Sequence, residues 1–521
     1  MQKLALFTLL SAAFALSTAI AAPPAPAKPK LVLAIAVDQF RYDYLQRFRS
    51  EYTGGLNRLM TRGAVFPNAQ YEAFPTVTAV GHSTFLTGAF PSVSGIIAND
   101  WYDRESGGNV TSVTDTSVKM LGGSGEGGSS PRRLLVSTVG DEMKISSNGK
   151  SRVIGISWKD RSAILPSGHM ADGAFWVESM TGAFVSSTFY FADLPSWVKD
   201  LNSSKPAEKY LGAEWNLEPY GGAKMKMPTA VDARFINAVQ TSPFGNEMLE
   251  LAAERAIVAE RLGKHEATDL LTLSLSSNDY VGHAMGPDSP EAHAISIHTD
   301  KLLDKLFRYL DGQIGMQNVL VVLTADHGVA PLPEKSIERK MPGGRLINKS
   351  VQNSVQKALE ARFGKGKWIL SSAENFLYFD RKLIQDKKLD SAEVQRVAAE
   401  GAMNTPHIAR AYTREQLLSG NVMDDIISRR VMHGYNPQRG GDLVIVAEPY
   451  WLAGAKGTTH GTPYNYDTHV PVILMGTGIK AGRFNRQVAP NDIAPTLAAI
   501  LGVEIPSGSN GRILEEILVT Q

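Results

Sequence analysis

The apolar runs of this chain are accompanied by side chains that bind metal ions. Near-continuous apolar runs of this length predict strands of a parallel sheet that is covered on both faces. The runs and their polar neighbours are 30–37 with Asp38, 270–276 with Asp279 and His283, 318–324 with Asp326 and His327, and 470–475 with His460 shortly before it. Ligands bind open α/β sheets outside the carboxyl ends of the strands. The pattern therefore predicts a metal site at one edge of such a sheet.

A chain of 521 residues exceeds a typical single domain, so we expect one large domain with insertions or two domains. Two of the predicted strands are separated by a helical pattern from about 290 to 310, which is the spacing of a parallel βαβ unit. Residues 166–244 are aromatic-rich and irregular and resemble an insertion over the sheet, whereas 335–455 resemble a second, charged and helix-rich insertion. We predict an α/β fold over 30–521, with a mostly parallel central sheet sandwiched by helices and two inserted cap regions.

The N-terminus has the pattern of a secretory signal. Lys3 precedes an apolar stretch over 4–16, and Ala19-Ile20-Ala21 matches the small-residue cleavage pattern. We predict a signal peptide over 1–21, a tether over 22–29, and a periplasmic or secreted protein; an uncleaved anchor is the alternative. No other run approaches the roughly 18 apolar residues of a membrane span, so we expect no stable span after cleavage.

The composition limits the kinds of partner that we expect and the residue types that can bind a metal ion. With 53 Lys and Arg against 52 Asp and Glu, the net charge of +1 gives no support for a nucleic-acid partner, and nothing implies a protein partner. The chain has no cysteine, which excludes disulfides, thiolate chemistry and cysteine-based zinc sites. Metal ligands must therefore be His, Asp, Glu or hydroxyl oxygens.

The candidate metal ligands and one hydroxyl group form a set that could catalyse a hydrolysis with bound metal ions. The set is Asp38, Thr78, Asp279, His283, Asp326, His327 and His460. Two metal ions about 4 Å apart can clamp the attacking and the leaving oxygen of an in-line displacement, so the set indicates a two-metal hydrolase. Thr76 is a rival to Thr78, which could also be a plain helix N-cap. His469 is a rival to His460, and we expect it to cap or pack at the start of a strand.

These residues stand in motifs that resemble those of the alkaline phosphatase superfamily, in the family's order and over nearly the whole length. The motifs are Val37-Asp38, Thr78 with Gly81-His82, Asn278-Asp279-Tyr280-x-x-His283 with Gly286-Pro287, Ala325-Asp326-His327-Gly328 and Thr459-His460-Gly461. The chain looks like the branch with a threonine nucleophile, the phosphate-irrepressible type. That branch has an asparagine as far from its threonine as Asn99 is from Thr78. It also has a pair like Lys159-x-Arg161, which separates phosphate-monoester enzymes from related nucleotide pyrophosphatase/phosphodiesterases.

The resemblance implies roles for these residues. One zinc ion would be held by Asp279, His283 and His460, and the other by Asp38, Asp326, His327 and the Thr78 oxygen. The residues alone would also allow Mn²⁺ or Co²⁺. Thr78 would attack phosphorus and form a phosphothreonine, while Asn99, Lys159 and Arg161 hold the outer oxygens of a small-molecule phosphate monoester. With Lys159 and Arg161 in the pocket, a third site for Mg²⁺ is not expected.

Other interpretations stay open at this point. The first is a phosphodiesterase or nucleotide pyrophosphatase on the same scaffold, and the second is a metal-stabilised binding protein without activity. A sulfatase-like Ser-x-Pro-x-Arg pattern begins at Ser129, but it lies far beyond Asp38, and Ser-Pro at a helix start is a plain capping arrangement. His82 and His169 lie beside site segments, and we expect both to be structural histidines.

Overall fold

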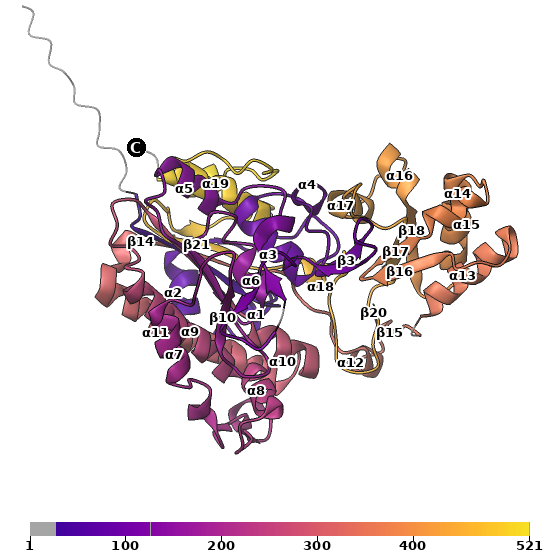
Figure 1. The fold of residues 1–521 in the computed structure, drawn as a ribbon. Helices are drawn as coiled ribbons and strands as arrows, with labels where there is room; N and C mark the ends of the chain where they lie inside the picture. The colour runs from indigo at the N-terminus through magenta and orange to yellow at the C-terminus, as the bar shows by residue number, and fades with distance from the viewer. Residues whose placement is uncertain (1–27, 126, 348, 520–521) are drawn as a thin grey trace, which may run out of the picture.

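A ten-stranded sheet is the centre of the structure, a computed structural model that describes residues 28–125, 127–347 and 349–519 (Figure 1). In spatial order the strands are β22 (Gly482–Arg483), β2 (Ala64–Phe66), β21 (Val472–Gly476), β14 (Val319–Thr324), β1 (Leu31–Val37), β13 (Asp269–Leu275), β8 (Val153–Ser157), β9 (Gly173–Val177), β10 (Phe184–Ser187) and β6 (Met120–Leu121). The predicted apolar runs thus form neighbouring strands in its middle.

The middle of this sheet is parallel. β1 pairs in parallel with β13 on one side and with β14 on the other, and the parallel pairing continues from β13 through β8 to β9. Every residue of β1, β13 and β14 is buried, because helices cover both faces of the sheet. β21 and β10 pair antiparallel on the two flanks. The predicted α/β fold with a mostly parallel central sheet is confirmed.

Alternate side chains of β1 point to opposite faces of the sheet and pack against different helices. Leu33 and Ile35 lie in the core shared with α2, α9 and α11, whereas Val32 and Ala34 lie in the core shared with α3, α5 and α19. These helices are α2 (Gly55–Arg62), α9 (Pro243–Ala259), α11 (Pro290–Ile314), α3 (Thr78–Thr87), α5 (Val139–Ser146) and α19 (Ile493–Leu501). Since each large buried side chain contributes about 1.5–3 kcal/mol, the two cores hold the strand ends firmly in place.

Helix α3 is buried along its whole length and packs directly against the turn that follows β14. It begins at Thr78 and ends at Gly88, whose left-handed φ of 67° closes the helix. The absence of a side chain at Gly81 allows the close approach, since a Cβ atom there would lie 2.2 Å from the Asp326 carbonyl oxygen. The start of α3 is thereby held at the carboxyl edge of the sheet.

The prediction that residues 166–244 lie over the sheet is wrong for their first part. β9 pairs in parallel with β8, and β10 pairs with β9, so this segment extends the central sheet. The remainder includes α7 (Ser196–Ser203) and α8 (Ala233–Gln240). Several aromatic side chains of residues 166–244 belong to the main core; the Phe175 and Trp197 rings, for example, meet edge to face with centroids 4.9 Å apart.

Residues 335–455, which we call the inserted lobe, contain a small sheet of their own. The sheet has the order β16 (Ile369–Ala373), β17 (Phe376–Phe379), β19 (Leu443–Ala447) and β18 (Ile408–Thr413), and it packs with α13 (Ser350–Phe363) and α15 (Ser391–Met403) around a separate apolar core. Figure 1 shows the lobe in orange beside the central sheet. α17 (Ile426–Gly434) joins the two parts, because the Phe74 N–H donates to the Arg430 carbonyl oxygen at 3.0 Å. The lobe therefore contacts the segment that leads into Thr78.

Within the described ranges, no helix is long and apolar enough to cross a membrane. The predicted signal peptide and most of the predicted tether lie outside the described residues. The described chain begins with Lys28 and Pro29, directly before the first central strand.

We predict that Gly81→Ala lowers the free energy of unfolding by about 1–3 kcal/mol, because the new methyl group overpacks the contact between α3 and the Asp326 backbone. Urea unfolding measures the loss. Gly312→Ala is the matched control, since this glycine of α11 has open space around its Cβ position and alanine there should stabilise the helix by about 0.5–1 kcal/mol. Equal stability changes in the two variants would contradict the close packing of α3.

Candidate active site

The carboxyl edge of the sheet gathers the predicted polar residues. The residues and the strands they follow are Asp38 after β1, Lys159 and Arg161 after β8, Asp279 and His283 in α10 (Ser277–Met285) after β13, and Asp326 and His327 after β14. β21 runs antiparallel to β14, so its beginning lies at the same edge, and the loop before it supplies His460. Segments far apart in the chain therefore meet because their strand ends coincide.

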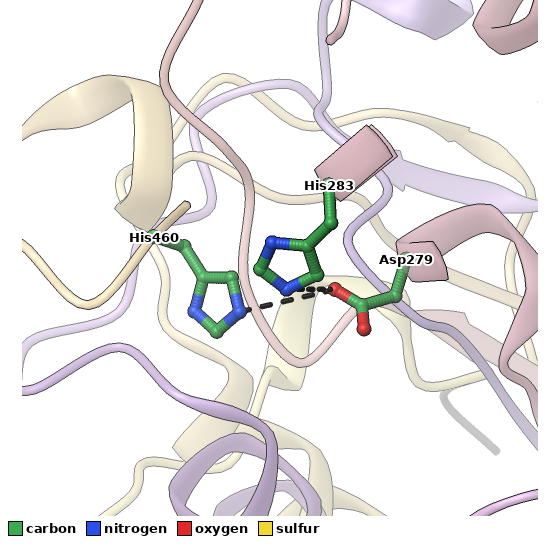
Figure 2. Close-up of side chains that lie close together, drawn as sticks. All are labelled: Asp279, His283 and His460. Atoms are coloured by element: carbon green, nitrogen blue, oxygen red, sulfur yellow. Dashed lines mark ion pairs between the residues drawn. The ribbon is translucent and has the colours of Figure 1, made fainter. Parts of the chain in front are cut away.

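Asp279, His283 and His460 form a first cluster that could hold a metal ion (Figure 2). Asp279 and His283 are four residues apart on α10, so their side chains lie on the same helix face. Asp279 Oδ1 lies 3.2 Å from His283 Nε2 and 3.8 Å from His460 Nε2. Atoms that each lie about 2.0–2.2 Å from one tetrahedral ion have comparable separations.

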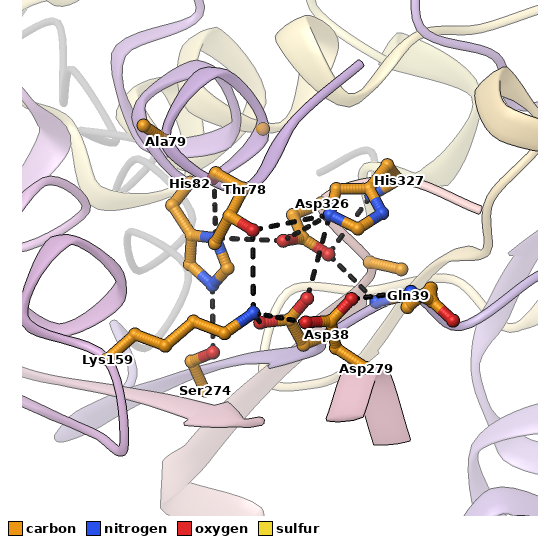
Figure 3. Close-up of polar contacts among 12 residues, drawn as sticks. Asp38, Gln39, Thr78, Ala79, His82, Lys159, Ser274, Asp279, Asp326 and His327 are labelled. Atoms are coloured by element: carbon orange, nitrogen blue, oxygen red, sulfur yellow. Dashed lines mark hydrogen bonds and ion pairs between the residues drawn. The ribbon is translucent and has the colours of Figure 1, made fainter. Parts of the chain in front are cut away.

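Asp38, Asp326 and His327 form a second cluster, with the Thr78 hydroxyl beside it (Figure 3). His327 Nε2 lies 3.2 Å from Asp326 Oδ2 and 3.7 Å from Asp38 Oδ1. Thr78 Oγ1 lies 3.4 Å from the same nitrogen. Asp38 and His327 also come within ligand distance of Asp279, so the two clusters adjoin.

The histidines of both clusters share one hydrogen-bond pattern. The Nδ1 atoms of His283, His327 and His460 lie 2.8, 2.9 and 2.8 Å from the carbonyl oxygens of Thr458, Gly328 and Thr76. A carbonyl oxygen can only accept, so each Nδ1 atom carries the proton and each Nε2 atom keeps its lone pair for the cluster. Metal-ligating histidines are typically oriented in this way.

The carboxylates crowd a small buried volume. Burial raises the pKa of Asp38 well above its usual range, and the neighbouring Asp326 carboxylate adds to the shift. Asp38 Oδ1 and Asp326 Oδ2 are buried and accept no hydrogen bond from the described part of the chain. A buried acceptor without a donor is costly, and a divalent cation would satisfy both atoms. Carboxylate oxygens and imidazole nitrogens are ligands that suit Zn²⁺, so the residues fit a binuclear metal site.

Lys159 contacts one carboxylate of each cluster, and Figure 3 shows its ammonium beside Asp38 and Asp279. Its Nζ atom is 2.7 Å from Asp38 Oδ2, 2.6 Å from Asp279 Oδ2 and 3.5 Å from Thr78 Oγ1. Burial opposes the charged ammonium, but Asp279 and Asp38 raise the pKa of Lys159 above its usual value. Burial alone would raise the pKa of Asp279, yet Lys159 and His283 hold it well below its usual range. The ammonium therefore neutralises carboxylates within reach of the Thr78 hydroxyl.

Asn99 and Arg161, the other predicted phosphate-binding residues, lie next to this centre. Asn99 Oδ1 accepts a hydrogen bond from the Ala79 N–H at 2.9 Å, which fixes the amide beside the start of α3. Arg161, in α6 (Asp160–Ile164), keeps 27% of its side chain exposed, and its charge acts against the protonation of Lys159. Asn99 thus holds its amide beside the residue after Thr78, and Arg161 adds positive charge near Lys159.

The residues that the sequence offered as alternatives to the site residues make contacts outside the two clusters. The Thr76 hydroxyl donates to the Thr462 carbonyl oxygen at 2.8 Å. His469 donates through Nε2 to the Pro67 carbonyl oxygen and stacks on Tyr42, which is a packing role. The Ser129 hydroxyl donates to Asp160 and stands in none of the clusters found among the described residues. His169 is likewise in none of these clusters.

His82 lies 3.2 Å from Asp326 Oδ2, but both of its ring nitrogens are engaged. Nδ1 is 2.9 Å from the Thr78 carbonyl oxygen, and Nε2 is 2.8 Å from the Ser274 hydroxyl. Because Nδ1 donates to the carbonyl, Nε2 accepts from Ser274, and no lone pair is left for a metal ion. His82 positions the first turn of α3.

Gln39 is part of the site, although the sequence analysis did not single it out. Its N–H donates to Asp326 Oδ1 at 3.0 Å, and its side-chain Nε2 donates to Asp279 Oδ1 at 2.5 Å. A left-handed φ of 62° turns the chain after Asp38 so that both contacts are possible. Its position directly after Asp38 is the signal that could have pointed to it.

An α/β sheet whose carboxyl edge buries adjoining Asp/His clusters beside a threonine hydroxyl defines a metal-dependent class of protein. The family model described as Type I phosphodiesterase / nucleotide pyrophosphatase matches residues 32–470. The chain is 38% identical to alkaline phosphatase PhoV from Synechococcus elongatus, over 95% of this chain and 94% of PhoV. It is 36% identical to alkaline phosphatase PafA from Elizabethkingia meningoseptica, over 94% of this chain and 95% of PafA.

The crystal structure of wild type alkaline phosphatase PafA superposes with a TM-score of 0.88 at 34% identity, and the match covers 95% of this chain and 100% of that one. The chain therefore belongs to the Type I phosphodiesterase / nucleotide pyrophosphatase family, and within the alkaline phosphatase superfamily it is a PafA-type alkaline phosphatase. The resemblance inferred from the motifs is confirmed.

We predict that Lys159→Met lowers the free energy of unfolding by about 3–5 kcal/mol in the presence of a chelator, because Asp38 and Asp279 lose their buried counter-charge. With excess zinc the loss should be much smaller, since bound cations then neutralise the same carboxylates. Urea unfolding with and without zinc measures both values.

Lys144→Met is the matched control. Lys144 is also mostly buried and pairs with Asp172 at 3.0 Å, away from the clusters, so zinc should not change its effect. A loss in Lys159→Met that is equally large with and without zinc would contradict the neutralisation of these carboxylates by metal ions.

Proposed function

We propose that this alkaline phosphatase hydrolyses small-molecule phosphate monoesters, with Thr78 as nucleophile and two zinc ions as cofactors. One ion would be held by Asp279, His283 and His460, and the other by Asp38, Asp326, His327 and the Thr78 oxygen. The observation that carries the proposal is the position of the Thr78 hydroxyl. It lies 3.4 Å from His327 Nε2 and 3.5 Å from Lys159 Nζ, on the first residue of α3.

The surroundings of Thr78 favour a nucleophilic oxygen. The N-terminal end of α3 carries the positive end of the helix dipole, which stabilises negative charge. The Lys159 ammonium adds a full positive charge nearby. Metal ions bound at the clusters would lower the pKa of the hydroxyl further and stabilise the leaving oxygen.

The reaction proceeds in two displacements at phosphorus. The Thr78 oxygen forms a bond to phosphorus while the bond from phosphorus to the ester oxygen breaks, which gives a phosphothreonine and the free alcohol. Water then attacks the same phosphorus, the Thr78 oxygen leaves, and inorganic phosphate is released. Asn99, Lys159 and Arg161 hold the outer oxygens, and the planar guanidinium of Arg161 suits two parallel hydrogen bonds.

The charges of Lys159 and Arg161 favour a monoester over a diester. A phosphate monoester carries close to two negative charges at neutral to alkaline pH, whereas a diester carries one. A phosphodiesterase on the same scaffold is the second candidate, because the matching family model bears that description. The two candidates differ in the substrate and not in the nucleophile.

We expect Thr78→Ala to lower kcat/KM for p-nitrophenyl phosphate at least about a thousandfold, because the variant has no nucleophile. Thr78→Ser should keep substantial activity. Zinc analysis by mass spectrometry on the same samples separates loss of the nucleophile from loss of metal. Thr76→Ala is the control, and a larger loss in this variant than in Thr78→Ala would assign the nucleophile to Thr76. Zinc-loaded wild-type protein that turns over no phosphate ester would refute the proposed function.

We expect Arg161→Ala to lower kcat/KM for p-nitrophenyl phosphate about a hundredfold but that for bis-p-nitrophenyl phosphate less than about tenfold, because the diester has lost one charged oxygen. Arg483→Ala, at the exposed end of the sheet in β22, should change neither value. A wild-type enzyme that strongly prefers the diester would reject the monoester assignment and favour the second candidate.

A further inference from the structure

The inserted lobe contains an apolar pocket of about 180 Å³ at the end of its small sheet. Leu377, Ile408 and Ile445 of the sheet, Val351 of α13 and Ala453 line it. None of the metal or phosphate residues proposed above lines this pocket, so it is a feature of the lobe.

Glu374 and Asn375, at the turn between β16 and β17, also line the pocket and at the same time touch the active site. Asn375 Nδ2 donates to the carbonyl oxygen of Gly461, the residue after His460, at 3.2 Å. Glu374 Oε1 accepts a hydrogen bond from Asn99 Nδ2 at 3.4 Å. The turn therefore forms a common wall between the pocket and the site, and Figure 1 shows the lobe next to the carboxyl edge of the central sheet.

The proposed mechanism indicates where the alcohol part of a substrate lies relative to the two clusters. In an in-line displacement the leaving oxygen departs on the side of phosphorus opposite to the nucleophile. Thr78 lies beside His327, so the leaving oxygen points toward the cluster of Asp279, His283 and His460. Asn375 joins the pocket to the chain at His460, and Glu374 joins it to Asn99, so the pocket adjoins the phosphate site at two points.

The lining indicates which alcohols fit. The lining is more aliphatic than polar, although Gln352 and Ser372 belong to it. A cavity of about 150 Å³ lined by aliphatic side chains is large enough for a benzene ring. The wall shared with the active site carries the Glu374 carboxylate, which repels an anionic substituent that passes it. The other charged lining residue, Lys349, is exposed to solvent.

We propose that this pocket of the inserted lobe binds the organic group of the substrate and selects phosphate monoesters of neutral, apolar alcohols about one aromatic ring in size. The inference rests on the proposed function and adds the substrate class to it. Glu374 and Asn375 then act as specificity residues that link the pocket to the phosphate site.

The test compares three alkyl phosphates with similar leaving oxygens on the zinc-loaded, unmodified enzyme: ethyl, 2-phenylethyl and 2-carboxyethyl phosphate. We expect kcat/KM for 2-phenylethyl phosphate to exceed that for ethyl phosphate about tenfold, since a phenyl group is buried, and 2-carboxyethyl phosphate to be the poorest. Equal values for all three esters would overturn the pocket but leave the proposed function intact. No turnover of any ester would overturn the proposed function and the pocket with it.

A pair of variants tests the position of the pocket. Ala453→Phe adds a ring to the lining and should reduce the preference for 2-phenylethyl over ethyl phosphate to about one. Ala455→Phe is the matched control, because Ala455 is exposed on the same loop but does not line the pocket, and the preference should stay near tenfold. A preference that survives Ala453→Phe, or that is lost equally in both variants, would overturn the assignment.

Discussion

The burial of Asp38, Asp279 and Asp326 at one edge of an apolar sheet is the constraint on which the rest of the site depends. Carboxylates removed from water cost several kcal/mol each unless positive charge or hydrogen-bond donors compensate for them. The compensating groups come from different parts of the chain. Lys159 follows β8, Gln39 turns back after β1, and the His327 backbone N–H after β14 donates to Asp326. Asp38 Oδ1 and Asp326 Oδ2, which accept no hydrogen bond from the described residues, are left to fit divalent cations.

Sheet topology explains how these distant groups meet. β1 lies between β13 and β14 in one register, so the residues that follow all of these strands leave the sheet at a common level. The antiparallel direction of β21 brings the loop with His460 to that level from the opposite end of its strand. A one-residue shift in the register of any of these strands would turn the metal-ligand candidate at its end away from the site. The pairing of the apolar strands therefore determines where these candidates lie.

The candidate metal ligands could be predicted from the sequence, whereas much of the structure around them could not. Asp38, Asp326 and His327 could be predicted because each follows a long apolar run, and Thr78 could be distinguished from Thr76 through its motif and its distance to Asn99. Gln39 has only its position after Asp38 as a signal, and its contacts depend on one left-handed residue that no hydrophobic pattern encodes. β9 and β10 were missed because their aromatic residues suggested an insertion, whereas backbone pairing at the sheet flank decides their place.

Under the proposed function, recognition of a substrate is divided between two parts of the chain. Residues after β8 and at the start of α3 would face the phosphoryl group, where their positive charge favours a monoester over a diester. The turn at Glu374 and Asn375 reaches the same site from a lobe that has its own apolar core. The opposite face of the lobe's sheet packs with Phe74 and Ala79, on either side of Thr78, in one shared apolar core. Substitutions on the pocket side of the lobe are therefore the ones that can change discrimination among alcohols without moving Thr78.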